Sequence, residues 1–272
     1  MQKFEHFIIT RFNLKLKEWV ITKQGEDVTS IAWLKHRFNL FETYCYPSII
    51  QQSNLNFKWL VCFDIETPEI YKQKIQNLRE SFANFVPIYI DSSTNANEII
   101  LKTIQSYCTN HTTHIITSRL DNDDSLHQEF VETVQQNFTP KASFIIDIIN
   151  GYQLNLKSHN TPAIRKIEAA FNPFVSLIEE KNNCVTVLSR IHLDWNTNPH
   201  KTIIDHPLWL QVIHEKNISN SEKLHFKEIN TIQFSDFGIT KYFKLKSNVN
   251  IALSNMITNF KRLFLKLKII KS

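Results

Sequence analysis

The sequence predicts an α/β fold in which a mostly parallel central sheet is flanked by helices. Short apolar runs typical of buried strands alternate with stretches of helical apolar spacing, which indicates consecutive strand–helix–strand units. Four of these runs also end in charged residues, as expected where parallel strands finish at one edge of a sheet. The strands are expected at residues 6–10, 57–64, 86–91 and 114–120.

Helices are expected between these strands because apolar residues recur there at intervals of three and four. The first covers residues 31–51 and should be broken at Pro47, since proline cannot continue an α-helix. Two more should begin near Thr67 and Asn95, and a fourth apolar helical face covers residues 126–138.

The second half of the chain gives a less regular pattern. A long strand is expected over residues 142–156, with a bend at Gly151. We expect a short helix over 173–180, a strand over 184–195, and a helix opened by residues 205–207.

The composition is that of a globular protein with a large core. The chain has 272 residues, of which 42% are hydrophobic and 12% aromatic, enough for one main domain, placed here at residues 1–236. Residues 237–272 carry eight of the 31 Lys and Arg residues and none of the 26 acidic ones. The positive net charge therefore belongs to this tail, and the domain is not expected to bind nucleic acid.

Rare residue types exclude several common motifs. The three glycines lie too far apart for a GxGxxG turn or a GxxxxGK phosphate loop. The four cysteines form no CxxC pair, which favours reduced thiols in a reducing compartment. No apolar run approaches the roughly 20 residues of a membrane span, and the first residues lack the apolar core of a signal peptide. We therefore expect a cytoplasmic protein.

Residues 249–271 place apolar side chains on one helical face and basic ones toward the other. A basic amphipathic helix of this kind suits the anionic inner face of a cytoplasmic membrane. An ordinary packed terminal helix shows the same pattern, so peripheral membrane binding is one of two expectations for this tail.

Three carboxylates follow the fourth strand within four positions: Asp121, Asp123 and Asp124. They repel one another at the end of a buried strand, so a divalent cation such as Mn²⁺ or Mg²⁺ is their natural partner. An acidic turn that caps the next helix is the alternative. A calcium-binding EF-hand loop is disfavoured because Leu126 stands where that loop needs glycine. An Asp-X-Asp element whose metal bridges the phosphates of a nucleotide sugar is favoured.

The earlier strands end in Arg11, Asp64 and Asp91, which a parallel sheet would place at the same edge as the acidic residues. Arg11 could pair with a diphosphate. Asp91 alone would mean little, because a single aspartate is a common turn residue. The candidates for binding a nucleotide-sugar donor are Arg11, Asp64, Arg119 and Asp121.

Six segments of the sequence resemble those of a known bacterial family. They are HFIITRFNL (6–14), YPSI (46–49), WLVCFD (59–64), TSRLDNDDSLH (117–127), PFVSLIE (173–179) and WLQVIHEKNISN (209–220). In these segments the chain is similar to the family labelled putative rhamnosyltransferases, which looks like a member of the GT-A class of nucleotide-sugar glycosyltransferases. The resemblance implies a GT-A-like fold and sugar transfer, and rhamnose is suggested by the family label alone.

The resemblance also implies roles for single residues. Asp123 and Asp124 would be metal ligands, and His214 would complete the metal site; a surface histidine at a helix end is the alternative. Asp205 would be the general base that deprotonates the acceptor hydroxyl, or else the cap of the helix that Pro207 opens. Further candidates are Asp147, Glu179 and His192.

These features predict a metal-dependent glycosyltransferase that moves a sugar from a nucleotide-diphosphate donor to a cell-surface polysaccharide or lipid-linked acceptor. A non-catalytic module that binds carbohydrate or nucleotide would use the same cleft. A metal-dependent phosphodiesterase is the third alternative, although the sequence has no clear series of His and Asp ligands for two metals.

Overall fold

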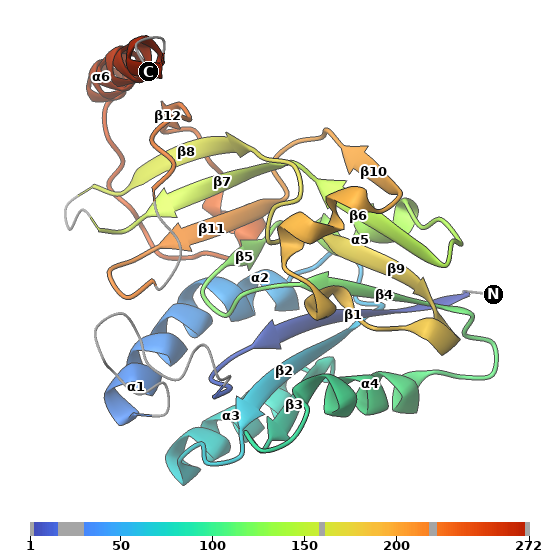
Figure 1. Cartoon of the computed structure of the whole chain (residues 1–272). Helices are drawn as coiled ribbons and strands as arrows, with labels where there is room; N and C mark the ends of the chain where they lie inside the picture. The colour runs from blue at the N-terminus through green and yellow to red at the C-terminus, as the bar shows by residue number, and fades with distance from the viewer. Residues whose placement is uncertain (1–2, 16–29, 158–160, 218–221, 270–272) are drawn as a thin grey trace.

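A seven-stranded sheet forms the centre of the protein, with the strand order β10-β6-β9-β4-β1-β2-β3 (Figure 1). The computed structural model describes residues 3–15, 30–157, 161–217 and 222–269, without the side chains of 260–269. The strands of this sheet are β1 (Phe4–Arg11), β2 (Lys58–Asp64), β3 (Phe85–Ile90), β4 (His114–Arg119), β6 (Ser143–Ile148), β9 (Ser176–Glu180) and β10 (His200–Ile203).

The parallel arrangement predicted for the first four strands is confirmed. β1 pairs in parallel with β2 and β4, and β2 pairs in parallel with β3. Their C-terminal ends, with Arg11 and Asp64 among them, therefore lie at one edge of the sheet. β9 runs antiparallel to both β4 and β6, so the sheet is mixed.

Helices cover both faces of this sheet. One face carries α1 (Ile31–Leu40), α2 (Tyr46–Ile50), α3 (Glu69–Ser81) and α5 (Phe130–Gln136). The other carries α4 (Ala96–Tyr107), which buries Ile100 and Ile104 against β1 and β2. Phe130 of α5 and Trp59 of β2 belong to the larger cluster, so the core is continuous from the helices into the sheet.

The helical path through Pro47 is continuous, and the break predicted there was wrong. A π-helical turn over Phe41–Cys45 joins α1 to α2, and the Tyr46 N–H donates to Phe41 O. Pro47, which has no N–H to donate, lies in the first turn of α2, directly after this π-helical turn. The wider turn lets α1 and α2 cover the sheet together.

A second sheet has the order β12-β8-β7-β11-β5. Its strands are β5 (Ser125–Leu126), β7 (Asn150–Asn155), β8 (Ala163–Glu168), β11 (Trp209–Ile213) and β12 (Glu228–Ile229). The single long strand expected over 142–156 is divided at Ile149 into β6, in the first sheet, and β7, in the second. Gly151 is required in β7, since a Cβ there would lie 2.0 Å from Cδ2 of Trp209.

Three secondary-structure predictions in the second half were wrong. Residues 176–180 form β9 instead of a helix, and the helix expected after Asp205 is strand β11. The strand expected over 184–195 is replaced by 3₁₀ turns at Val187–Ser189 and His192–Thr197. The helix expected over 126–138 is present as α5 but begins only at Phe130, because Ser125 and Leu126 pair with β11. β9 and β11 are buried on both faces, so their apolar residues run without the alternation that marks a half-buried strand.

The C-terminal helix α6 (Asn248–Ile269) packs against β12 through a few polar contacts. Asn255 Nδ2 donates to Glu228 O at 2.9 Å. On another side of the helix, Val249, Leu253 and Met256 are exposed. In the described part of the chain, no helix is both long and apolar enough to cross a membrane.

Candidate functional site

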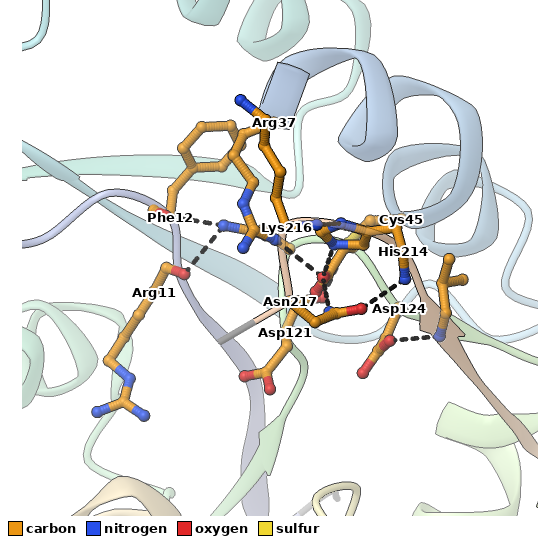
Figure 2. A network of polar contacts seen from close by, with 12 residues as sticks. Arg11, Phe12, Arg37, Cys45, Asp121, Asp124, His214, Lys216 and Asn217 are labelled. Carbon is orange, nitrogen blue, oxygen red and sulfur yellow. Dashed lines mark hydrogen bonds and ion pairs between the residues drawn. The ribbon is translucent and has the colours of Figure 1, made fainter. Parts of the chain in front are cut away.

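Asp123 is the centre of a buried polar network just past the end of β4. Figure 2 shows its partners Arg37, His214 and Asn217. Its Oδ2 accepts from Arg37 Nη1 at 2.8 Å, from His214 Nε2 at 2.8 Å and from Asn217 Nδ2 at 3.2 Å. Only 4% of Asp123 is exposed. Burial raises the pKa of the Asp123 carboxyl, but Arg37 and His214 outweigh it and bring the pKa down to about 2. The carboxylate is therefore ionised and fixed in position.

The pKa of Asp124 is shifted in the opposite direction. Its Oδ1 accepts the Val212 N–H of β11 at 2.8 Å, and its buried Oδ2 has no hydrogen-bond partner among the described residues. Burial, followed by the neighbouring charges of Asp123 and Asp121, raises the pKa of Asp124 well above its ordinary value. The pair thus combines one ionised carboxylate with one that favours the neutral form.

Asp121 is paired with Arg119 at the partly open side of the network. Arg119 Nη2 lies 3.1 Å from both carboxylate oxygens, and about a third of the Asp121 side chain is exposed. Arg11 lies in the same region: burial first, and then the positive charge of Arg119, lower its pKa. In Figure 2 the side chains of Arg11 and Asp121 extend away from the Asp123 network. Three of the four predicted donor-binding residues are therefore neighbours.

Asn122 fixes the acidic loop to the end of β1. Its Nδ2 donates to Phe12 O at 2.8 Å, and its Oδ1 accepts from Arg37 Nη1 at 3.2 Å. One guanidinium thus binds two consecutive residues of the loop. The position of Asp123 depends in this way on the end of β1 as well as on α1.

Asp64 lies at the predicted sheet edge, but its oxygen atoms accept hydrogen bonds within its own turn. Its Oδ1 accepts the Glu66 N–H at 2.8 Å, and its carbonyl accepts from Thr67 Oγ1 at 2.6 Å. Asp91 does the same, accepting the Ser93 N–H at 2.8 Å. The structure does not bring either carboxylate into contact with the Asp123 network.

Asp205 lies apart from the other predicted site residues. It precedes β11, whereas His214 follows it, and the strand between them spans roughly 13 Å at about 3.3 Å per residue. Its exposed carboxylate accepts from His206 N at 2.7 Å and from His206 Nδ1 at 3.1 Å. Asp205 therefore belongs to a second polar cluster, at the other end of β11.

The further candidates have structural partners. Glu179 accepts the N–H groups of Val185 and Thr186, at 3.1 and 3.0 Å. Both oxygens of Asp147 lie 3.0 Å from the N–H of Phe171, which has a left-handed φ of 48°. The Phe171 carbonyl is in contact with Nδ1 of His192. The Asp147 carboxylate thus holds a strained residue.

His192 is the further candidate on which the charges of the donor residues act. Burial lowers the pKa of its imidazole, and Arg119 and Asp121 are among the charged groups that act on it. The half-buried Lys223, whose own pKa is lowered by burial, also acts on His192. Lys223 was missed in the sequence because it follows the last recognisable motif.

Arg37 and Asn217 were missed for different reasons. Arg37 lies on the apolar face of α1 beside Trp33 and Leu34, where a buried arginine signals an internal partner. That signal was available in the sequence but did not say which acid would be the partner. Asn217 belongs to the WLQVIHEKNISN segment, and only the fold shows that it reaches Asp123.

The residues around Asp123 offer carboxylate oxygens of the kind that Mn²⁺ and Mg²⁺ take, together with the imidazole of His214. The partnerless Oδ2 of Asp124 suits a cation ligand. Asp123 Oδ2 already accepts three donors, so a cation that binds this oxygen would displace one of them. The donor set thus fits a divalent cation, although Arg37 provides the positive charge that faces Asp123 here.

Comparison with solved structures gave distant likenesses. S. aureus TarS 1-349 is 10% identical over 76% of this chain, with a TM-score of 0.44, and this chain covers 60% of that fragment's length. The same fragment in complex with UDP is 13% identical, covering 78% of this chain and 61% of its own, with a TM-score of 0.42. A putative nucleotide-diphospho-sugar transferase from Desulfovibrio desulfuricans G20 is 6% identical over 79% of this chain and 83% of its own, with a TM-score of 0.39. No curated protein matched the chain.

Comparison with protein families gave a match over most of the chain. The family described as "Putative rhamnosyl transferase" matches residues 9–225. This range contains Arg11 and the whole Asp123 network, from Arg37 to Asn217. The family resemblance seen in the sequence is thereby confirmed. The chain belongs to the putative rhamnosyl transferase family.

Proposed function

We propose that the protein is a metal-dependent glycosyltransferase that moves a sugar from a nucleotide-diphosphate donor to a cell-surface polysaccharide or lipid-linked acceptor. The observation that carries this proposal is the Asp123 network at the sheet edge of a family member, with two arginines beside it. Rhamnose is the first donor sugar to test, because the family description names it.

The donor is proposed to bind where Arg11 and Arg119 lie near each other. Two guanidinium groups of like charge in a partly buried site favour a bound anion, and a diphosphate accepts their planar N–H pairs well. Asp121, still partly exposed, would accept hydrogen bonds from the ribose or sugar hydroxyls. Its pairing with Arg119 keeps that carboxylate in position.

Asp123 and His214, with Asp124, would hold Mn²⁺ or Mg²⁺. Such a cation would stabilise the charge of the departing diphosphate as a Lewis acid. Within the chain, Arg37 neutralises Asp123, and Asn217 supplies a further donor to the same oxygen. These contacts pre-organise the acidic loop and so reduce the reorganisation needed when a donor binds.

His192 is proposed as the general base. The Nδ1–H would donate to the Phe171 carbonyl, which leaves the lone pair of Nε2 available, and the lowered pKa keeps the ring neutral at pH 7. Nε2 would take the proton of the acceptor hydroxyl while the acceptor oxygen bonds to the anomeric carbon and the bond from that carbon to the diphosphate breaks. Asp205, the base predicted from the sequence, is the alternative. It is less favoured because it lies at the end of β11 opposite His214.

Thermal unfolding with a panel of nucleoside diphosphates and nucleotide sugars, with and without Mn²⁺, tests the proposal. We expect Mn²⁺-dependent stabilisation by at least one nucleotide in the wild type, and its loss in Asp123→Asn. Asp91→Asn is the matched control, since that exposed aspartate only closes its own turn. Stabilisation by no nucleotide would contradict the proposal. Stabilisation without any release of nucleoside diphosphate from donor and acceptor would indicate a binding module.

The two candidate bases can be separated by kinetics. We expect His192→Gln to lower kcat at least 100-fold, in line with the usual worth of a general base, and to remove the acidic limb of the pH profile. A large loss in Asp205→Asn together with a normal pH profile in His192→Gln would restore Asp205 as the base.

A further inference from the structure

A second group of potential metal ligands lies at the end of β11 opposite the Asp123 network. His127 follows β5, Glu129 precedes α5, and His206 precedes β11. One ligand atom from each lies within 4.8 Å of the other two, and no other such trio was found among the described residues. His127 is buried, whereas His206 and Glu129 are exposed. Three separate segments therefore converge on one point.

The contacts orient these side chains toward a common centre. His206 Nε2 lies 3.0 Å from Glu129 Oε2, and His206 Nδ1 lies 3.1 Å from Asp205 Oδ1. Nε2 of His127 lies 3.6 Å from Asp236 Oδ2, and the two imidazole rings are 4.8 Å apart. A carboxylate on the far nitrogen of a histidine is the usual support of a metal-binding imidazole, and Asp205 occupies that place for His206.

The cluster also has an open pocket beside it. His127, His206 and Asp236 line a pocket of about 490 Å³, together with Tyr152 and Phe237. A cation could therefore enter from solvent and keep a water molecule as a further ligand.

We propose that His127, Glu129 and His206 bind a transition-metal ion of the Zn²⁺ type, with a water molecule as the fourth ligand. Two imidazoles, one carboxylate and a water are a set that Zn²⁺ accepts in tetrahedral geometry, whereas Mg²⁺ prefers oxygen ligands alone. The ion would join the end of β5 and the turn before α5 to the start of β11. This site is separate from the proposed donor site, since the two lie at opposite ends of β11.

Binding requires one rearrangement of protons. In the unloaded cluster, Nδ1 of His127 accepts the Glu129 N–H at 3.2 Å, so Nε2 carries the proton. The metal would replace the proton on Nε2. Nδ1 would take up a proton and would lose the hydrogen bond that it accepts from Glu129 N. The imidazole stays neutral throughout.

Titration of the metal-free full-length protein with Zn²⁺, followed by calorimetry, and with Co²⁺, followed by its visible absorption, tests this site. We expect a tetrahedral Co²⁺ spectrum and one bound Zn²⁺ ion per chain that Asp123→Asn retains. His206→Ala and Glu129→Gln should each weaken binding at least about tenfold. Both side chains are more than 40% exposed, so these variants should fold.

Two controls make the outcome decisive. His111→Ala removes an exposed histidine elsewhere and should bind as the wild type does. Asp123→Asn should also keep the site, because its carboxylate belongs to the other network. Absence of Zn²⁺ binding in the wild type, or binding that Asp123→Asn abolishes and His206→Ala leaves intact, would overturn the proposal.

Discussion

Arg37 is the nearest positive charge to Asp123, and both side chains are almost fully buried. Removing one partner of such a pair leaves an uncompensated charge, which costs about 3–5 kcal/mol. We therefore expect Arg37→Met to lose about that much unfolding free energy in urea. Excess Mn²⁺ should restore part of it, because the cation can replace the missing guanidinium at Asp123.

The exposed pair Lys74–Glu42, also 2.8 Å apart, provides the control for Arg37→Met. Lys74→Met should cost less than about 1 kcal/mol, since solvent screens both charges. An Arg37→Met protein as stable as the wild type without any cation would contradict our account of the network.

His6 should make stability depend on pH. Its ring is buried between Ser118 Oγ, 2.8 Å from Nε2, and Gln135 Nε2, 3.2 Å from Nδ1. Burial lowers its pKa from 6.5 to about 3. Between these values the unfolded chain binds a proton that the folded chain does not, so stability falls as the pH falls from 6.5 toward 3, by up to about 1.4 kcal/mol per pH unit.

Urea unfolding between pH 4.5 and 7.5 measures this dependence. We expect His6→Gln to flatten it, and the exposed-site variant His111→Gln to leave it unchanged. An equally steep slope in His6→Gln would assign the dependence to other groups.

The sequence predicted those residues of the candidate site that lie at the end of a strand or soon after it. Arg11 and Asp123 could be recognised because each comes directly after a buried parallel strand. The partners of Asp123 could not, because Arg37 and Asn217 are 86 and 94 positions away, and no local pattern encodes those contacts. Asp205 was placed by motif position, which did not reveal that β11 separates it from His214.

At the level of elements, the first half of the fold was predictable and the second half was not. Strands β1 to β4 alternate with helices that have one apolar face. Their short apolar runs are therefore easily distinguished from the helical spacing of three and four. In β9 and β11 nearly every residue is buried, and a short buried segment without alternation of apolar and polar residues fits a helix as well as a strand. Their identity depends on pairing with distant strands, such as β9 with β4.

The junction of the two sheets gives a prediction at this scale. Gly151 of β7 faces the ring of Trp209 in β11, with no room for a methyl group. Gly151→Ala should cost about 1–3 kcal/mol in unfolding free energy through overpacking. In the double variant with Trp209→Leu, the cost of the alanine should largely disappear, because the ring it meets is gone. Strictly additive costs would show that the two positions do not interact.

At the level of the whole molecule, α6 has an exposed apolar stripe. Val249, Leu253 and Met256 are 77%, 52% and 50% exposed, and their spacing of four and three places them on one face. The tail around them carries basic residues and no acidic ones. We therefore propose that α6 lies on an anionic membrane surface.

Sedimentation with phosphatidylserine-containing vesicles tests this proposal. We expect the full-length protein to bind them at low salt and to bind phosphatidylcholine vesicles far less. The double variant Leu253→Gln, Met256→Gln should lose most of this binding while keeping the contacts of Asn255 with β12. Equal partitioning of the wild type and this variant, and of a chain lacking residues 247–272, would contradict membrane contact through α6.

The contacts of Asp123 also determine when, during synthesis, a working site can exist. Its partners lie 86 positions earlier, at Arg37, and 91 and 94 positions later, at His214 and Asn217. A nascent chain that has emerged only as far as β9 can form β1 to β4 but lacks β11, whose Val212 N–H binds Asp124. Until β11 has been synthesised, the adjacent carboxylates of Asp123 and Asp124 have only the Arg37 guanidinium beside them. The acidic loop should therefore become protected from proteases only after β11 has emerged, and any release of the chain before Asn217 yields a sheet without the complete Asp123 network.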